Sequence, residues 1–396
     1  MATSDINALH EELLQCRRCG ICRNAVYEAR GFDGICPVWK NGGGFETDFM
    51  RGKIVVALAL LSGQLDRSSE NMESLFRCTL CGNCAQICPA GFNPTKSLET
   101  VRSLLSDVPI RTRDEIADRI MHHDNPYTED SADKRAWVSR LGFEVPRVGE
   151  FVYFAGCTSA LRLPEVALNT ARILRAAGID FAVMEDEPCC GSVMLRTGRL
   201  SDAKSNAMRV AEKIHNTGAS TIVVSCAGCL KTLREDLSHM GIGIPRVVHI
   251  TELALELIRE GRLTPRISGQ PMRVTYHDPC HLGRGTGIYE EPREILKAIA
   301  GIDFVEMETN RGTAMCCGAG GGVRAFDSQL ALKIASDRIR TAERTGATHL
   351  VTACPFCEHN LSSGRNSIGS ALSVVDITEL LAQCLEEDDR NHRPGH

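Results

Sequence analysis

The sequence predicts an α/β protein in which a small helical domain precedes two repeated α/β halves related by an approximate two-fold axis. Three observations support this fold class. Short helical stretches rich in cysteine fill residues 1–110. From residue 151 onward, short β-branched runs alternate with longer amphipathic segments, which is typical of α/β units on parallel sheets. This second region also repeats its own sequence motifs in the same order.

The composition is that of an ordinary globular protein. The 396 residues are 43% hydrophobic and 24% charged, enough for a large core and two or three domains. The net charge of −5 offers no basic excess for nucleic acid, so we expect protein and small-molecule partners. No signal-peptide pattern opens the chain, and its longest apolar run, residues 54–61, is far shorter than the about 20 residues that span a bilayer. We therefore expect a cytoplasmic protein, associated with a membrane only through a partner chain.

Within residues 1–110, apolar residues recur at helical spacing in three stretches, which are 6–14, 50–61 and 95–105. We expect these stretches to be the helices of a small domain. A polar, charge-rich stretch without cysteine follows at 111–148 and is typical of a connector.

The repeat divides the rest of the chain. GASTIVVSCAGCLKTL at 218–233 aligns with GATHLVTACPFCEHNL at 346–361, and HITELALELI at 249–258 aligns with DITELLAQCL at 376–385. The expected strands are FVYF, FAVM, TIVVS, RVVHI, MRVTY, DFVEM and HLVTA, and the expected helices include 165–177 and 329–343. We predict two homologous halves, 149–266 and 267–385, followed by a charged, disordered tail at 386–396.

Nineteen cysteines indicate metal binding. Disulfide frameworks belong to short secreted chains, whereas these cysteines recur in Cys-x-x-Cys and Cys-Cys units. Cys384 alone falls outside every motif, on an expected helix, where a thiol usually behaves as a small buried hydrophobic group.

The first eight cysteines have the spacing of a bacterial two-cluster ferredoxin. The run ending in Cys88-Pro89 has the full pattern, with Cys78, Cys81 and Cys84 at close spacing. A second copy begins at Cys16, Cys19 and Cys22, but thirteen residues including the loop NAVYEARGFDGI separate it from Cys36-Pro37.

In that pattern the fourth cysteine of each run binds the other cluster. We therefore predict one [4Fe–4S] cubane on Cys16, Cys19, Cys22 and Cys88, and a second on Cys78, Cys81, Cys84 and Cys36, although the insertion before Cys36 departs from the standard spacing. Two zinc sites are the alternative, since Cys-x-x-Cys pairs also suit zinc.

The last ten cysteines form two sets of five. The first set is Cys157, Cys189, Cys190, Cys226 and Cys229, and the second is Cys280, Cys316, Cys317, Cys354 and Cys357. Several follow β-branched runs directly, so they are expected to converge at the carboxyl ends of parallel strands. Five thiolates with an adjacent pair suit a more open cluster than a cubane.

These motifs resemble the CCG domains of heterodisulfide reductase. The segments VYFAGC, CCGSVMLRTG, CAGC, YHDPCHLGR, CCGAGGG and ACPFC are similar to the archaeal D-subunit, in which a two-cluster ferredoxin domain is fused to two CCG repeats. The resemblance implies that each set of five cysteines holds one noncubane [4Fe–4S] cluster. It also implies a disulfide reductase that takes electrons from a partner through the cubanes and cleaves a small disulfide between the noncubane clusters.

Related iron–sulfur subunits of glycolate, lactate and glycerol-3-phosphate dehydrogenases share this architecture. The alternative function is therefore a non-catalytic electron-transfer subunit of a flavin-dependent 2-hydroxy acid or glycerol-3-phosphate dehydrogenase complex, and a third is a zinc-binding interaction module. A substrate-sized cavity between the noncubane clusters would distinguish the first two. No flavin or nicotinamide fingerprint is evident, so we expect the electron donor to be another chain of flavoprotein, membrane cytochrome or hydrogenase type.

Few other residues are candidates for a role. His277 and His281 flank Cys280 and could donate protons to a product thiolate, or else hydrogen-bond cluster sulfur or the strand end. Arg284 and Arg324 could steer an anionic substrate, although a surface role is the default expectation. The glycines of GAGGG at 318–322 indicate close backbone approach to a cluster rather than a phosphate loop.

Overall fold

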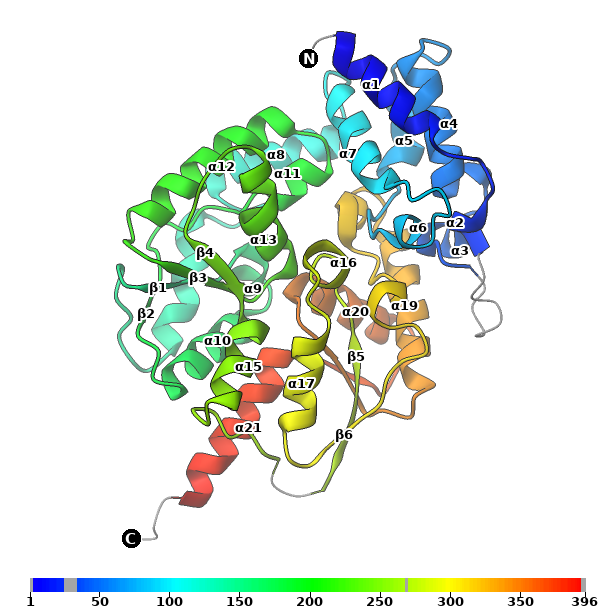
Figure 1. Cartoon of the computed structure of the whole chain (residues 1–396). Coiled ribbons are helices and arrows are strands. Elements are labelled where there is room, and N and C mark those ends of the chain that lie inside the picture. Colours follow the sequence, from blue (N-terminus) through cyan, green and yellow to red (C-terminus); the bar gives the residue numbers. More distant parts are fainter. Residues whose placement is uncertain (1–2, 25–33, 268–269, 393–396) are drawn as a thin grey trace.

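The computed structural model describes residues 3–24, 34–267 and 270–392 and shows three parts. The N-terminal helical domain, blue to cyan, lies against one end of the two α/β halves (Figure 1). The first half is green and the second is yellow to orange, and the two lie side by side (Figure 1). The mixed α/β fold with two repeated halves is confirmed.

The helical domain contains the three expected helices as α1, α4 and α7. Its elements are α1 (Thr3–Leu14), α2 (Ile21–Asn24), α3 (Pro37–Asn41), a 3-10 turn (Glu46–Asp48), α4 (Met50–Leu61), α5 (Ser69–Phe76), α6 (Asn83–Gln86) and α7 (Pro94–Leu104). Buried apolar side chains such as Leu13, Met72 and Val101 form its core. Most of the inserted loop predicted between Cys22 and Cys36 lies outside the described residues.

The stretch predicted as a connector packs against the first half. It consists of α8 (Arg111–His123) and a 3-10 helix (Ser131–Arg140), and it contacts α9, α10, α11 and α12. Trp137 is buried, and its ring meets that of Tyr153 edge-on at 5.8 Å between centroids. This segment is therefore a covering layer of the first half.

Each half contains a four-stranded parallel sheet with the same strand order, β2-β1-β3-β4 in the first and β6-β5-β7-β8 in the second. The strands are β1 (Phe151–Phe154), β2 (Phe181–Ala182), β3 (Thr221–Val224), β4 (Arg246–His249), β5 (Met272–His277), β6 (Ile302–Phe304), β7 (His349–Thr352) and β8 (Ser373–Asp376). Seven of these strands agree with the expected ones. The eighth, β8, is not among them, and the repeat places it opposite β4.

The helices of the halves confirm the two-fold relation. They are α9 (Cys157–Leu161), α10 (Pro164–Ala176), α11 (Ser192–Arg196), α12 (Leu200–His215), α13 (Ala227–Lys231), α14 (Leu237–His239), α15 (Ile250–Arg259), α16 (Gly283–Thr286), α17 (Glu290–Ala298), α18 (Val323–Phe326), α19 (Ser328–Glu343), α20 (Pro355–Ser367) and α21 (Ile377–His392). The first long helix of each half packs on the last helix of the other, α10 on α21 and α17 on α15. Helix α21 ends at His392, and the disorder expected for the tail at 386–396 stays a prediction.

Two glycines of GAGGG bring the second half against the helical domain. A Cβ on Gly320 would lie 2.6 Å from the Thr79 carbonyl oxygen, and one on Gly321 would lie 2.2 Å from the Cys78 carbonyl oxygen. Gly321 also has a φ of +61°, which glycine adopts at least cost. The close approach is thus to the backbone that carries Cys78.

Replacing Gly321 by alanine is expected to loosen the helical domain. The new Cβ would clash with backbone that cannot move aside, in addition to about 1–2 kcal/mol of strain from the left-handed conformation. Gly346→Ala is the matched control, because Gly346 has a φ of +71° and open space around its Cβ position. Thermal unfolding should give a clearly larger loss for Gly321→Ala, and equal losses would contradict the close approach.

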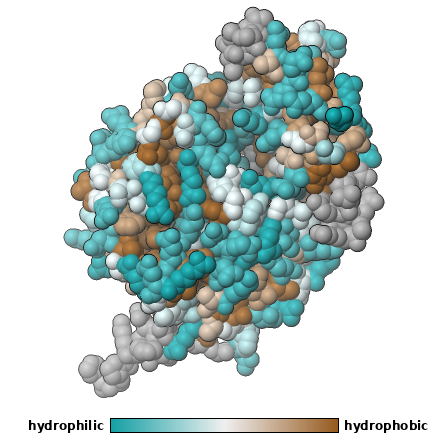
Figure 2. Space-filling model, viewed as in Figure 1, coloured by the Kyte–Doolittle hydropathy of each residue, from teal (hydrophilic) through white to brown (hydrophobic). Residues whose placement is uncertain are grey.

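Hydrophilic residues cover most of the visible face of the two halves, and hydrophobic residues form separate patches on it (Figure 2). Among the helices of the described residues, none combines the length and apolar character required to cross a membrane.

Candidate iron–sulfur centres and the cavity between them

The five cysteines of each half lie where parallel strands end and helices begin. In the first half, Cys157 follows β1, Cys226 caps α13 after β3, and the Cys189–Cys190 pair precedes α11. The second half repeats this placement with Cys280 after β5, Cys354 at the start of α20 and Cys316–Cys317 in the loop before α18. The expected convergence at the carboxyl ends of the strands is therefore observed.

The sulfurs form a continuous row of neighbours. Cys157 Sγ lies 3.9 Å from Cys189 Sγ, and Cys190 Sγ lies 3.4 Å from Cys229 Sγ. Successive side-chain contacts order the row as Cys157, Cys189, Cys190, Cys229, Cys226, Cys354, Cys357, Cys317, Cys316 and Cys280. The two sets of five thus meet at Cys226 and Cys354.

A cavity of about 520 Å³ lies at this junction. Nine of the ten cysteines line it, all except Cys316. Its volume is in the range of sites that bind small molecules. Thr112, Ile116 and Arg119 of α8 also line it, together with Tyr127. The segment predicted as a connector therefore forms part of the cavity wall.

The eight cysteines of the helical domain lie close together, and their neighbours can be compared with the two groups of the crossed pattern. Cys16, Cys19, Cys22 and Cys88 line a small cavity of about 30 Å³, which Cys84 also borders. Cys36 is close enough to Cys78 and Cys81 for their charges to interact, although the insertion separates them in sequence. Cys19 is exposed, whereas Cys81 is buried against the second half. The binding of a cluster by each group remains a prediction.

The helical domain meets the second half through Cys81. The side chain of Cys81 is a direct neighbour of that of Cys316. Arg284 of the second half donates to the Cys81 carbonyl oxygen at 2.6 Å and to the Ala314 carbonyl oxygen at 3.0 Å. Asn83 donates to that same Ala314 oxygen at 3.2 Å. The surface role expected for Arg284 is wrong, because its guanidinium joins the two domains.

The electrostatic surroundings of the thiols suit anionic clusters. Lys53, Arg102 and Arg338 are at most 1% exposed, and within the described residues they donate hydrogen bonds to neutral groups. Lys53 and Arg102 lie near Cys78, and Arg338 lies near Asp278 and, less closely coupled, Cys316. A buried cation is costly unless negative charge compensates it, and a thiolate-bound cluster supplies that charge.

Burial alone would keep these thiols protonated. It raises the pKa of Cys22 to about 11 and that of Cys36 to about 12. A bound metal deprotonates such thiols outright. Thiolate sulfur is the donor type that selects iron–sulfur clusters or zinc, so the donor set and the buried cations together fit the predicted clusters.

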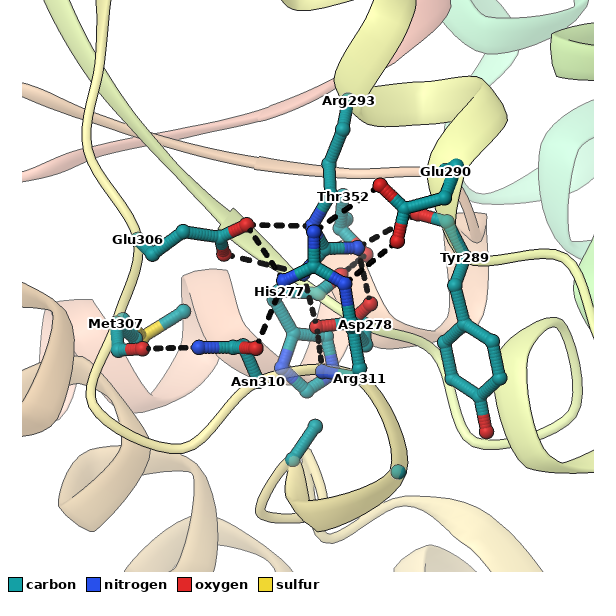
Figure 3. A network of polar contacts seen from close by, with 12 residues as sticks. His277, Asp278, Tyr289, Glu290, Arg293, Glu306, Met307, Asn310, Arg311 and Thr352 are labelled. Atoms are coloured by element: carbon teal, nitrogen blue, oxygen red, sulfur yellow. Dashed lines mark hydrogen bonds and ion pairs between the residues drawn. The ribbon is translucent and has the colours of Figure 1, made fainter.

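Ionic networks hold the strand ends beside the cysteines. In the second half, Arg293 donates to both carboxylate oxygens of Asp278 at 2.7 and 2.9 Å, and the Arg311 backbone N–H donates to Asp278 at 2.9 Å (Figure 3). In the first half, Glu187 accepts from the backbone N–H groups of Ala155 and Gly156. Buried charge-assisted bonds of this kind restrict the movement of the backbone that carries the first cysteine of each set.

The two histidines beside Cys280 point to different places. His281 lines the cavity, and burial together with nearby Arg196 and Lys231 lowers its pKa to about 3, so the ring is neutral at physiological pH. His277 is 1% exposed, and a ring nitrogen lies within 4.8 Å of the sulfurs of Cys317 and Cys357. Arg324 also lines the cavity and donates to Asn360.

Models of known protein families match the two α/β halves and the helical domain separately. The model for the cysteine-rich domain, CCG, matches residues 151–234 and 274–362. The model for the 4Fe-4S dicluster domain matches residues 12–92. A chain that joins these domains is an iron–sulfur oxidoreductase subunit.

Relatives then specify the family. The chain is 36% identical to the D-subunit of the dihydromethanophenazine:CoB–CoM heterodisulfide reductase of Methanosarcina acetivorans, over 94% of each chain. This chain belongs to the family of heterodisulfide reductase D-subunits.

More distant relatives share part of their length with it. The B-subunit of the CoM/CoB fumarate reductase of Methanothermobacter marburgensis is 33% identical over 80% of this chain and 63% of its own. The EtfAB:quinone oxidoreductase of Syntrophomonas wolfei is 30% identical over 79% of this chain and 47% of its own. A hypothetical protein from Helicobacter pylori has a similar fold, with a TM-score of 0.57 at 8% identity, over 97% of this chain and 77% of that protein.

Proposed function

We propose that this chain is the disulfide-reducing subunit of a heterodisulfide reductase-type complex. Two [4Fe–4S] cubanes in the helical domain would accept electrons from a partner chain. Two noncubane [4Fe–4S] clusters, one on each set of five cysteines, would deliver them to a disulfide. The balanced reaction takes one disulfide, two electrons and two protons to two thiols.

The cavity of about 520 Å³ lined by cysteines of both halves is the observation that carries this proposal. A disulfide bond needs two electrons, whereas an iron–sulfur cluster passes one at a time. A substrate between two such centres can receive one electron from each side, which avoids release of a thiyl radical. The cavity has to hold the clusters as well as a substrate, and its wall extends beyond the cysteines to Arg119, Tyr127 and Arg324.

The contact between Cys81 and Cys316 supports an order of electron transfer. Electrons would enter at the cubane near exposed Cys19, pass to the cubane that includes Cys81, and reach the second noncubane centre next. The first centre lies beyond the cavity, at the far end of the row of sulfurs. Within the chain, Arg284 would hold the two domains at this contact.

The partner that supplies electrons would dock near the exposed Cys19. We expect a flavoprotein, a membrane cytochrome or a hydrogenase-type chain. Association with a membrane would then depend on that partner.

Anaerobic purification with iron and sulfide analysis tests the proposal first. Four clusters require about sixteen irons per chain. Electron paramagnetic resonance of the oxidised protein should gain a new signal when a suitable small thiol is added, because the product binds beside a cluster. About eight irons, or no response to any thiol, would contradict disulfide reduction.

The related EtfAB:quinone oxidoreductase favours one alternative, a non-catalytic electron-transfer subunit of a flavin-dependent dehydrogenase complex, such as one for 2-hydroxy acids or glycerol-3-phosphate. That function needs every cysteine as well. It predicts sixteen irons with no thiol-dependent signal, so the same experiment separates the two functions.

A further inference from the structure

The two five-cysteine centres differ in their surroundings although their cysteines match. The repeat aligns YHDPC at 276–280 with YFAGC at 153–157, so His277 corresponds to Phe154. Both side chains are buried at the end of an equivalent strand, at 1% and 0% exposure. Only the second centre therefore has an imidazole at this position.

A buried arginine fixes which nitrogen of His277 carries the proton. Arg338 of α19 donates from Nε to His277 Nδ1 at 3.2 Å. A guanidinium has donors only, so Nδ1 must be unprotonated and Nε2 must carry the hydrogen. Burial lowers the pKa of Arg338 to about 10, which leaves it charged at neutral pH.

Arg338 is itself held in place. It donates to Thr309 Oγ1 at 2.9 Å and to the Thr309 carbonyl oxygen at 3.1 Å. In the first half, the repeat aligns Arg338 with Val210 of α12 at a shift of 128 residues, or with Ala211 at a shift of 127. Both of these residues are buried and apolar. The histidine and its arginine thus occur together in the second half, and both have apolar counterparts in the first.

His277 Nε2 has no oxygen or nitrogen partner. It is a buried atom without a hydrogen bond in the part of the chain that the structure describes. The sulfurs of Cys317 and Cys357 lie within 4.8 Å of a His277 ring nitrogen. Buried donors are rarely left unsatisfied in native proteins, and sulfur is the acceptor at hand.

We propose that His277, oriented by Arg338, donates a hydrogen bond from Nε2 to sulfur of the second centre and makes that centre easier to reduce than the first. Hydrogen bonds to cluster sulfur are among the factors that set iron–sulfur potentials. His277 is a positioning residue in this role, since it acts through the ligand sulfur. The inference rests on the proposed clusters.

The asymmetry suits the order of electron transfer. The second centre contacts the cubane relay through Cys316, so it must take electrons before the first centre does. A higher potential there would hold an electron at the entry side of the cavity until substrate arrives. Two identical centres would not provide this retention.

Substitution of His277 by phenylalanine tests the proposal, because it copies the first half. An anaerobic redox titration followed by electron paramagnetic resonance should show one couple shifted to lower potential, by at least a tenfold change in its reduction equilibrium, or about 59 mV. Exchangeable-proton coupling to that centre, measured in heavy water, should weaken. His277→Gln, which retains an N–H donor, should recover part of both effects.

Thr275→Val is the matched control on the same strand, since Thr275 is buried and its hydroxyl has no hydrogen-bond partner in the described part of the chain. It should leave all couples unchanged. Sixteen irons with unchanged potentials in His277→Phe would overturn the role of His277 alone. About eight irons in the unmodified protein would instead overturn the proposed clusters.

Discussion

Replacing Cys317 by serine is expected to leave the first centre oxidised while the cubanes are reduced. Cys317 lies in the middle of the second set of sulfurs, where it lines the cavity and neighbours Cys316, the residue that meets Cys81. Its loss should remove the second centre and so break the only relay through adjacent sulfurs that we find among the described residues. Disulfide reduction should fall by at least about 100-fold, the upper end of the loss seen when groups supporting a metal site are removed.

Cys190→Ser is the matched variant in the first half, because the repeat aligns Cys190 with Cys317. It should abolish turnover to a similar extent, but the second centre should still accept an electron at the unmodified rate. Rapid-mix, freeze-quench electron paramagnetic resonance with a reduced protein donor, too large to enter the cavity, separates the two cases.

Iron analysis provides the control for both variants. Each should retain about twelve irons, since only one centre is lost. Equal reduction of the first centre in Cys317→Ser and in the unmodified protein would contradict the proposed order. In that event electrons would have to reach the first centre by another path.

The repeated motifs make much of the fold predictable. Because the two halves repeat the same motifs in the same order, the sequence predicts two equivalent parallel sheets and an approximate two-fold, and the structure confirms both. The same repeat aligns RVVHI at 246–250 with SVVDI at 373–377, so β8 is also predictable by comparison with β4.

The packing of other elements over the cysteine motifs is not predictable in the same way. Spacing shows which cysteines belong to one set, but it does not show which other elements pack over them. The residues of α8 that line the cavity have only a polar, amphipathic pattern, which is also that of an exposed helix. Arg284 and Arg338 resemble surface arginines in the sequence because a single sequence does not reveal burial.

A comparison of the two repeated halves identifies Arg338 and His277 as unusual residues. Arginine is uncommon in a fully buried position, and Arg338 falls on the apolar side of a helix whose counterpart in the first half has Val210 and Ala211. A comparison of the halves position by position therefore singles out Arg338, and His277 opposite Phe154, from the sequence alone. Differences between repeats indicate where two otherwise equivalent sites have separate roles.

Replacing Arg102 by methionine is expected to destabilise the protein by about 3–5 kcal/mol, because each buried carbonyl group left without its donor costs about 1–3 kcal/mol. Arg102 is 0% exposed and its guanidinium donates to carbonyl oxygens of all three parts of the fold. These are Leu75 and Cys78 in the helical domain, Arg196 in the first half and Gly321 in the second. Methionine keeps much of the volume but leaves these four carbonyl groups without their donor.

Arg67→Met is the matched control in the same domain. Arg67 is 42% exposed and its nearest acidic partner, Asp107, is 4.0 Å away, so its loss should change stability by less than about 0.5 kcal/mol. The measurement is thermal unfolding followed by far-ultraviolet circular dichroism, which applies both to the anaerobic cluster-bound protein and to the iron-free chain.

Arg102→Met should also expose the segment between the helical domain and the first half to limited proteolysis, because the bonds that join the three parts are lost. Since Arg102 lies near Cys78, its charge also balances the predicted second cubane. The destabilisation should therefore be larger with clusters bound than in the iron-free chain. An equal loss in both forms would show that Arg102 acts through its carbonyl bonds alone, and no loss relative to Arg67→Met would contradict its bridging role.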